Sequence, residues 1–96
     1  MLDQDKIRQI AREVATANLS PEAISDVLTK TFTDSEGAQA IGITIVLNSE
    51  SLGKIKGDDT LNTLVDMHAR LQKAGEDRFP SIEYATEDEL HESGNA

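Results

Sequence analysis

The chain has 96 residues, the length of one domain with a single core, and carries a net charge of −9 at pH 7. It contains no cysteine, which excludes disulfides, thiolate zinc sites and cysteine nucleophiles. Its three aromatic residues are too few for a platform on which nucleic-acid bases stack.

The first predicted element is an amphipathic helix over residues 3–18, in which apolar residues recur every three or four positions and Asp3 supplies the cap. Ser20 and Pro21 begin a second helical turn, yet the threonine-rich alternation that follows favours a strand. We therefore expect a turn at 21–25 and a strand at about 26–33. A helix that continues through residue 30 is the competing interpretation.

The strand over residues 40–48 has the clearest pattern in the chain. Its large aliphatic residues alternate with smaller ones, which is typical of a half-buried strand in a mainly antiparallel sheet: Ile41, Ile43, Ile45 and Leu47 share one face. A turn at 34–37 should precede this strand, and a polar loop at 49–57 should follow it.

The second long helix is predicted over residues 58–75, capped by Asp58 or Asp59 and ended by Gly75. Five residues at helical spacing form its most apolar stripe, and we expect them to face the core: Leu61, Leu64, Val65, His68 and Leu71. His68 should then be at least half buried.

The last elements are a strand at 79–84, with Ile82 and Tyr84 pointing inward, and a short acidic helical turn at 86–92. We predict a single α+β domain over residues 1–92 and a frayed tail at 93–96. The order α-β-β-α-β implies a three-stranded, mostly antiparallel (mixed) sheet with both long helices on one face. The other face should show Thr29, Thr31, Thr33, Thr44 and Val46.

The loop Gly53–Gly57 is the one segment in which lysines lie between glycines, and Lys54 and Lys56 could face a phosphate there. Two acids follow the loop at once, so a solvated connector is the favoured interpretation. The element order resembles the KH group of RNA-binding folds, whose clamp is a basic Gly-x-x-Gly loop between two helices. The resemblance covers about 60 residues and includes no sequence motif.

No pattern in the sequence predicts catalysis. No segment matches the calcium loop, the Walker phosphate loop or a dinucleotide-binding fingerprint. The two histidines, His68 and His91, have no serine or carboxylate partner that the sequence can place beside them. We therefore expect a protein that is not an enzyme and that holds no metal and no cofactor.

The most distinctive string runs from Gly75 through Tyr84 and reads Gly-Glu-Asp-Arg-Phe-Pro-Ser-Ile-Glu-Tyr. It resembles a stretch found in short, uncharacterised bacterial proteins of similar length. That resemblance implies no activity and no functional residue. The simpler interpretation is the end of a helix and the entry into a strand, with Arg78 balancing the acids beside it.

Negative charge is concentrated at the C-terminus. Residues 76–96 hold seven acids and one base, whereas residues 1–75 hold eleven acids and eight bases. Such a segment repels phosphates and attracts basic surfaces. The candidate partner-binding residues are Glu83, Glu87, Asp88, Glu89 and Glu92.

These observations predict a small acidic, non-catalytic adaptor or regulator that binds a basic protein, of which an antitoxin-like role is one form. The alternatives are a KH-like nucleic-acid binder that uses Lys54 and Lys56, or a structural homodimer that pairs exposed sheet edges. Without an apolar run of membrane-spanning length or a signal-peptide pattern, the chain is expected to be cytoplasmic, without contact to membranes or nucleic acid, and a monomer or weak homodimer.

Overall fold

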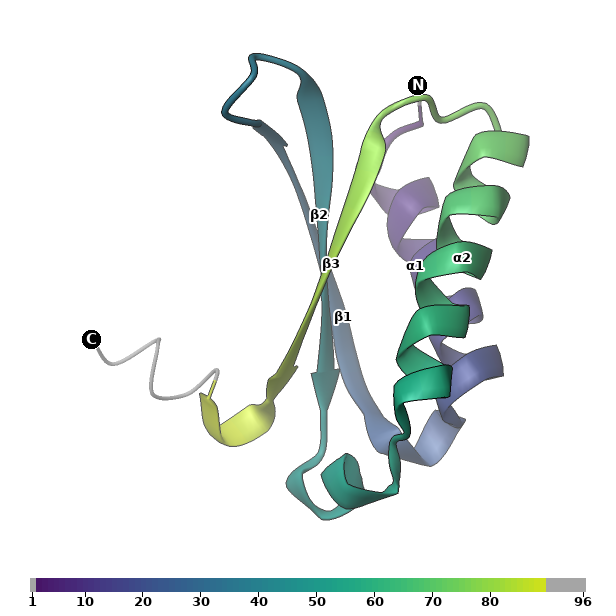
Figure 1. Cartoon of the computed structure of the whole chain (residues 1–96), viewed down its shortest axis with the longest axis vertical. Coiled ribbons are helices and arrows are strands. Elements are labelled where there is room, and N and C mark those ends of the chain that lie inside the picture. Colours follow the sequence, from purple (N-terminus) through teal and green to yellow (C-terminus); the bar gives the residue numbers. More distant parts are fainter. Residues whose placement is uncertain (1, 90–96) are drawn as a thin grey trace.

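The computed structural model describes residues 2–89 and contains a helix pair beside a three-stranded sheet (Figure 1). Two short 3₁₀ helices, η1 and η2, connect the main elements of this part of the chain. In chain order the elements are α1 (Gln4–Leu19), η1 (Pro21–Ala23), β1 (Ile24–Thr33), β2 (Gln39–Leu47), η2 (Ser49–Lys54), α2 (Gly57–Lys73) and β3 (Phe79–Thr86).

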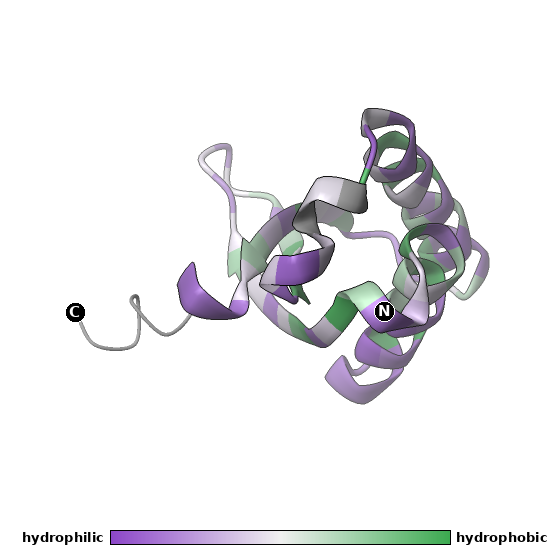
Figure 2. Cartoon of the chain, turned by 90° about the horizontal axis from the view of Figure 1, so that it is seen from below, coloured by the Kyte–Doolittle hydropathy of each residue, from purple (hydrophilic) through white to green (hydrophobic). Residues whose placement is uncertain are grey.

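The predicted α+β order is confirmed. The strand order is β1-β2-β3; β1 pairs with β2 antiparallel, and β3 pairs with β2 parallel. Parallel neighbours need a crossover connection, which α2 supplies. Figures 1 and 2 both show α1 and α2 on the same side of the sheet, so its opposite side is not covered by a helix.

β1 and β2 form a hairpin whose turn contains Asp34 and Gly37. The Asp34 carboxylate accepts hydrogen bonds from the backbone N–H groups of Glu36 (2.9 Å) and Ala38 (3.0 Å). Gly37 has φ +86°, a conformation that glycine adopts without strain. β1 begins at Ile24, directly after η1, so the competing helix through residue 30 is wrong. The β-branched and aromatic side chains from residue 27 onward pair with β2 instead of forming a helical stripe.

The predicted exposed face of the sheet is wrong for β1. Thr29 lies opposite Ile43 and Thr31 lies opposite Ile41, and directly opposed residues share a face. The β1 threonines therefore lie on the helix side, where the Thr29 hydroxyl donates to Gln4 of α1. Threonine fits either face of a pleated strand, so the alternation in β1 does not by itself show which of its faces packs against the helices. The uncovered face carries Leu28, Lys30 and Phe32 from β1, with Gly42, Thr44 and Val46 from β2.

The core lies between the sheet and both long helices, and α1 contributes most of its helical residues. The inward residues of β2 are at most 1% exposed, and they contact the apolar stripe of α1, which includes Ile7, Ala11 and Val14. The Asp3 side chain caps α1 by accepting a hydrogen bond from the Lys6 backbone N–H (2.8 Å). The helix begins at its predicted cap and buries the predicted face.

Asp26 holds α1 against the edge strand. Its carboxylate is 3.0 Å from the guanidinium groups of both Arg8 and Arg12. Burial by itself would raise the pKa of Asp26, but the Val27 backbone N–H and the two guanidinium groups outweigh it and lower that pKa. Arg8 also donates to the Val27 carbonyl (3.0 Å), which covers part of the free edge of β1.

The prediction of the buried face of α2 is wrong. The residues that α2 buries are Thr63, Met67 and Leu71, of which only Leu71 belongs to the predicted stripe. The other four members of that stripe are exposed: Leu61 by 59%, Leu64 by 39%, Val65 by 62%, and His68 as well. Helix α2 therefore turns its less apolar face to α1 and the sheet, and its more apolar face to solvent.

The segment predicted as a polar loop contains η2. Gly53 and Lys54 belong to η2 and Gly57 begins α2, so only residues 55 and 56 lie between the two helices. The cap of α2 also differs from the prediction. Lys56 precedes the helix, and the Asp59 carboxylate accepts a hydrogen bond from its backbone N–H (3.2 Å), so Asp58 and Asp59 both lie in the first turn.

Candidate functional site

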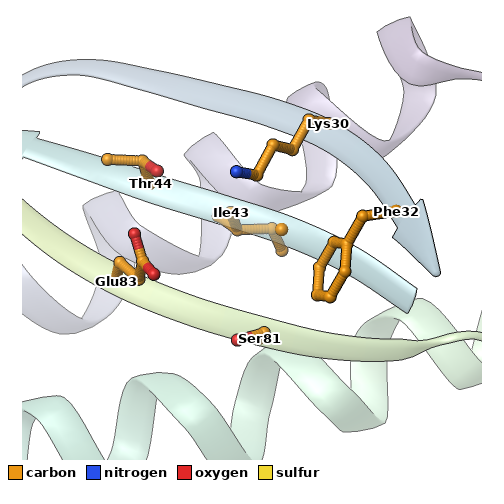
Figure 3. A pocket seen from close by; sticks show the side chains of 7 residues that line it. Lys30, Phe32, Ile43, Thr44, Ser81 and Glu83 are labelled. Carbon is orange, nitrogen blue, oxygen red and sulfur yellow. The ribbon is translucent and has the colours of Figure 1, made fainter. Parts of the chain in front are cut away.

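The uncovered face of the sheet holds a hollow of about 170 Å³. Lys30 and Phe32 of β1 form one wall, and Ser81 and Glu83 of β3 form the other. Figure 3 shows these side chains on opposite sides of β2, on which Thr44 and Ile43 lie between the two walls. The hollow therefore combines an ammonium, an aromatic ring, two hydroxyls and a carboxylate.

Gly42 creates the space into which Lys30 and Phe32 extend. A Cβ atom at position 42 would lie 3.0 Å from Cε of Lys30 and 3.5 Å from Cε1 of Phe32. The lysine ammonium lies 6.0 Å from the centre of the Phe32 ring, at the outer limit of a cation–π contact. A glycine in the middle of a strand often marks such a close approach, and it is the sequence signal that could have identified this hollow.

Glu83, which the sequence selected for partner binding, lies at this hollow. It is exposed on β3 and opposite Thr44, and its carboxylate forms no ion pair with any base in the described part of the chain. Its charge is therefore available to a cation outside the domain. Ser81 shares the hollow with Lys30 and Glu83, and no histidine is among the residues that line it.

The other predicted partner-binding acids follow β3 directly. Residues 87–89 form a helical turn on the side of the sheet away from the helices, coloured as hydrophilic in Figure 2. Glu87 is exposed, and the Asp88 carboxylate accepts a hydrogen bond from the Ser49 hydroxyl (3.0 Å). Glu89 has a structural role, because its carboxylate accepts from the hydroxyl (3.1 Å) and backbone N–H (3.3 Å) of Thr86. Glu92 and the tail at 93–96 lie outside the described residues.

Of the two lysines proposed for the alternative phosphate site, the structure describes the side chain of Lys56 but not that of Lys54. Lys56 is exposed and precedes α2, whose first turn contains Asp58 and Asp59. The backbone of Lys54 ends η2, and its side chain lies outside the described part of the structure. Two carboxylates in the first turn of α2 compete with a phosphate for the positive end of that helix.

Outside the hollow, the described residues offer one histidine but no metal-binding cluster and no membrane-spanning helix. His68 is exposed, and its ring contacts Phe79 edge-on with 5.6 Å between the ring centres. Within residues 2–89 no group of three or more histidine, aspartate or glutamate side chains is arranged to hold a metal ion. In the same range no helix is both long and apolar enough to cross a bilayer.

Comparison of the chain with protein-family models, curated proteins and solved structures gives no significant match. The geometry of the uncovered sheet face and of the acidic turn beside it is therefore the basis for the functional proposal.

Proposed function

We propose that this protein is a non-catalytic binding domain that recognises a basic partner protein through the uncovered face of its sheet. The observation that carries the proposal is the position of Glu83 and Glu87. Both are exposed on or directly after β3, on the side of the sheet away from the helices, and neither is paired with a base among the described residues.

The same face offers apolar contact beside the charge. Leu28 and Phe32 are exposed by 38% and 36%, and Phe32 borders the hollow that Glu83 borders from the other side. A partner's arginine can place its apolar stem against Phe32 while its guanidinium approaches Glu83, and arginine is the residue best suited to combine these contacts. The hydroxyls of Ser81 in one wall and of Thr44 between the walls add hydrogen-bond acceptors.

A comparison of charge variants in pull-downs tests the proposal. The triple variant Glu83→Gln, Glu87→Gln, Asp88→Asn removes three charges from the proposed surface. The control variant Asp5→Asn, Glu36→Gln, Asp77→Asn removes three exposed charges elsewhere, so the two variants have the same net charge. Each variant and the unaltered chain are used to capture proteins from the native lysate at low and physiological salt, with quantification by mass spectrometry.

The expected result is that basic proteins captured by the unaltered chain are retained by the control variant and lost by the surface variant. Capture should also weaken as salt is raised, because exposed ion pairs are screened. Equal recovery of every protein by both variants would refute the proposal.

A further inference from the structure

The apolar stripe that α2 exposes continues onto β3. Two shallow hollows, of about 300 and 430 Å³, meet at Leu64. The first reaches Ile82 and Tyr84, and the second reaches Phe79, which is 60% exposed. The surface of this stripe is defined here by Leu61, Leu64, Val65, His68, Ala69, Gln72 and Phe79 and contains no formally charged residue. We call it the α2 stripe.

The α2 stripe is large enough to be a binding surface. Its exposed fractions correspond to on the order of 400 Å² of mostly apolar surface, the size at which patches on monomers are commonly functional. A basic partner is not selected by a surface without charge. The free edge of β3 is also poorly suited to strand pairing, since Pro80 has no N–H to donate.

We infer that the α2 stripe binds the α2 stripe of a second copy of this chain, with the two helices antiparallel across a two-fold axis. A two-fold axis at the middle of the stripe places residues whose numbers add to 133 opposite each other. Leu61 then faces Gln72 of the second copy, Leu64 faces its Ala69, and Val65 faces its His68. Each leucine meets a smaller or more flexible residue, which suits close packing of two helices.

Charge complementarity specifies the antiparallel direction. Asp58 precedes the stripe at the N-terminal end of α2, and Lys73 follows it at the C-terminal end, about 22 Å away along the helix axis. Both are exposed, and neither forms an ion pair within the described part of its own chain. In the antiparallel pair each Asp58 approaches Lys73 of the other copy, whereas a parallel pair would place like charges together.

The test is the oligomeric state of the purified full chain, measured by sedimentation velocity from about 1 µM to about 1 mM. We expect a reversible dimer. Val65→Glu should raise the dissociation constant at least about tenfold, because it buries a charge at the centre of the interface. Leu28→Glu, which alters an exposed leucine on the uncovered sheet face, is the matched control and should leave the dissociation constant unchanged.

The charge swap identifies the partner as a second copy. Asp58→Lys and Lys73→Glu should each weaken the dimer, because each places like charges together, and the double variant should restore it. A monomer at every concentration would overturn the inference, as would a dimer that Val65→Glu leaves intact or a double variant that is not rescued. The stripe and the uncovered sheet face share no residue, so the dimer and the capture of basic proteins can fail independently.

Discussion

Glu76 and Arg78 form a two-pronged ion pair that contacts the backbone of Leu2. Nε of Arg78 is 2.8 Å from Oε2 of Glu76, and its Nη2 is 2.9 Å from Oε1. Glu76 also accepts a hydrogen bond from the Leu2 backbone N–H (2.8 Å), and Arg78 donates to the Leu2 carbonyl (3.1 Å). Glu76 is only 2% exposed, so this short segment after α2 holds both Leu2 and the entry into β3.

Replacing Glu76 should strongly destabilise the protein. Glu76→Ala leaves the Arg78 guanidinium largely buried without its partner, and breaking a buried pair on one side typically costs about 3–5 kcal/mol. The free energy of unfolding in urea measures the loss. Asp77→Asn is the matched control, because Asp77 is exposed between the two paired residues, and it should change stability by less than about 0.5 kcal/mol.

The same pair predicts acid sensitivity. The hydrogen bonds from Arg78, followed by those from the Leu2 and Arg78 backbones, outweigh burial and lower the pKa of Glu76 from 4.5 to about 2. The stabilisation is therefore complete above pH 4.5 and is lost as the pH falls toward 2, a total of about 3 kcal/mol. Urea unfolding of the unaltered chain and of Glu76→Gln across this pH range should show their stability difference shrinking. A difference that stays constant with pH would contradict the prediction.

A new negative charge should lower the stability of the fold much more at position 67 of α2 than at the neighbouring position 68. Met67 is fully buried, so Met67→Asp should destabilise the fold by several kcal/mol or prevent folding (about 3 kcal/mol or more). His68 is exposed, so His68→Asp should cost less than about 1 kcal/mol. The comparison is made by urea unfolding at a protein concentration where the chain is monomeric. A larger loss for His68→Asp than for Met67→Asp would mean that α2 is rotated relative to the structure.

Ser20 offers a stabilising substitution. It follows α1 with φ 96° and ψ 139°, a backbone conformation that residues with a Cβ atom rarely adopt, and its side chain makes no capping hydrogen bond to η1. Ser20→Gly should raise the free energy of unfolding by about 0.5–1 kcal/mol, whereas Ser20→Ala should not raise it, because alanine keeps the Cβ atom. Thermal unfolding of the three proteins in parallel gives the ranking.

Nucleic acid should not bind to the chain. The Gly53–Gly57 segment is not a free loop, because Gly53 and Lys54 end η2 and Gly57 begins α2. A net charge of −9 also opposes the phosphate neutralisation on which non-specific binding depends. We expect no shift of RNA or DNA at low salt and about 10 µM protein. A shift that disappears in the Lys54→Ala, Lys56→Ala variant would favour the KH-like alternative.

The sequence by itself determined the type and order of the elements, since each rests on local chemistry. Strict alternation from Ile41 to Leu47 specified the central strand, and Asp3 and the apolar stripe of α1 specified the first helix and its buried face. These predictions hold because β2 and α1 each have a single apolar face, and that face can be buried in only one orientation of the element. Glu83 is exposed on the edge strand β3, as expected for a charged side chain there, and its role in partner binding stays a prediction.

Only the tertiary structure decided which face of α2 is buried and which face of β1 is uncovered. Two overlapping stripes of α2 can each pack against a sheet, and the crossover from β2 to β3 selects the one with Thr63, whose small side chain suits a close approach to α1 and β3. Hydrophobicity alone favours the stripe with Leu61, Leu64 and Val65, because the sequence pattern carries no information about where the sheet ends. The more apolar face of α2 lies beyond the edge strand β3, where the sheet does not cover it. The residues with the strongest core pattern, Leu61, Leu64 and Val65, are therefore exposed.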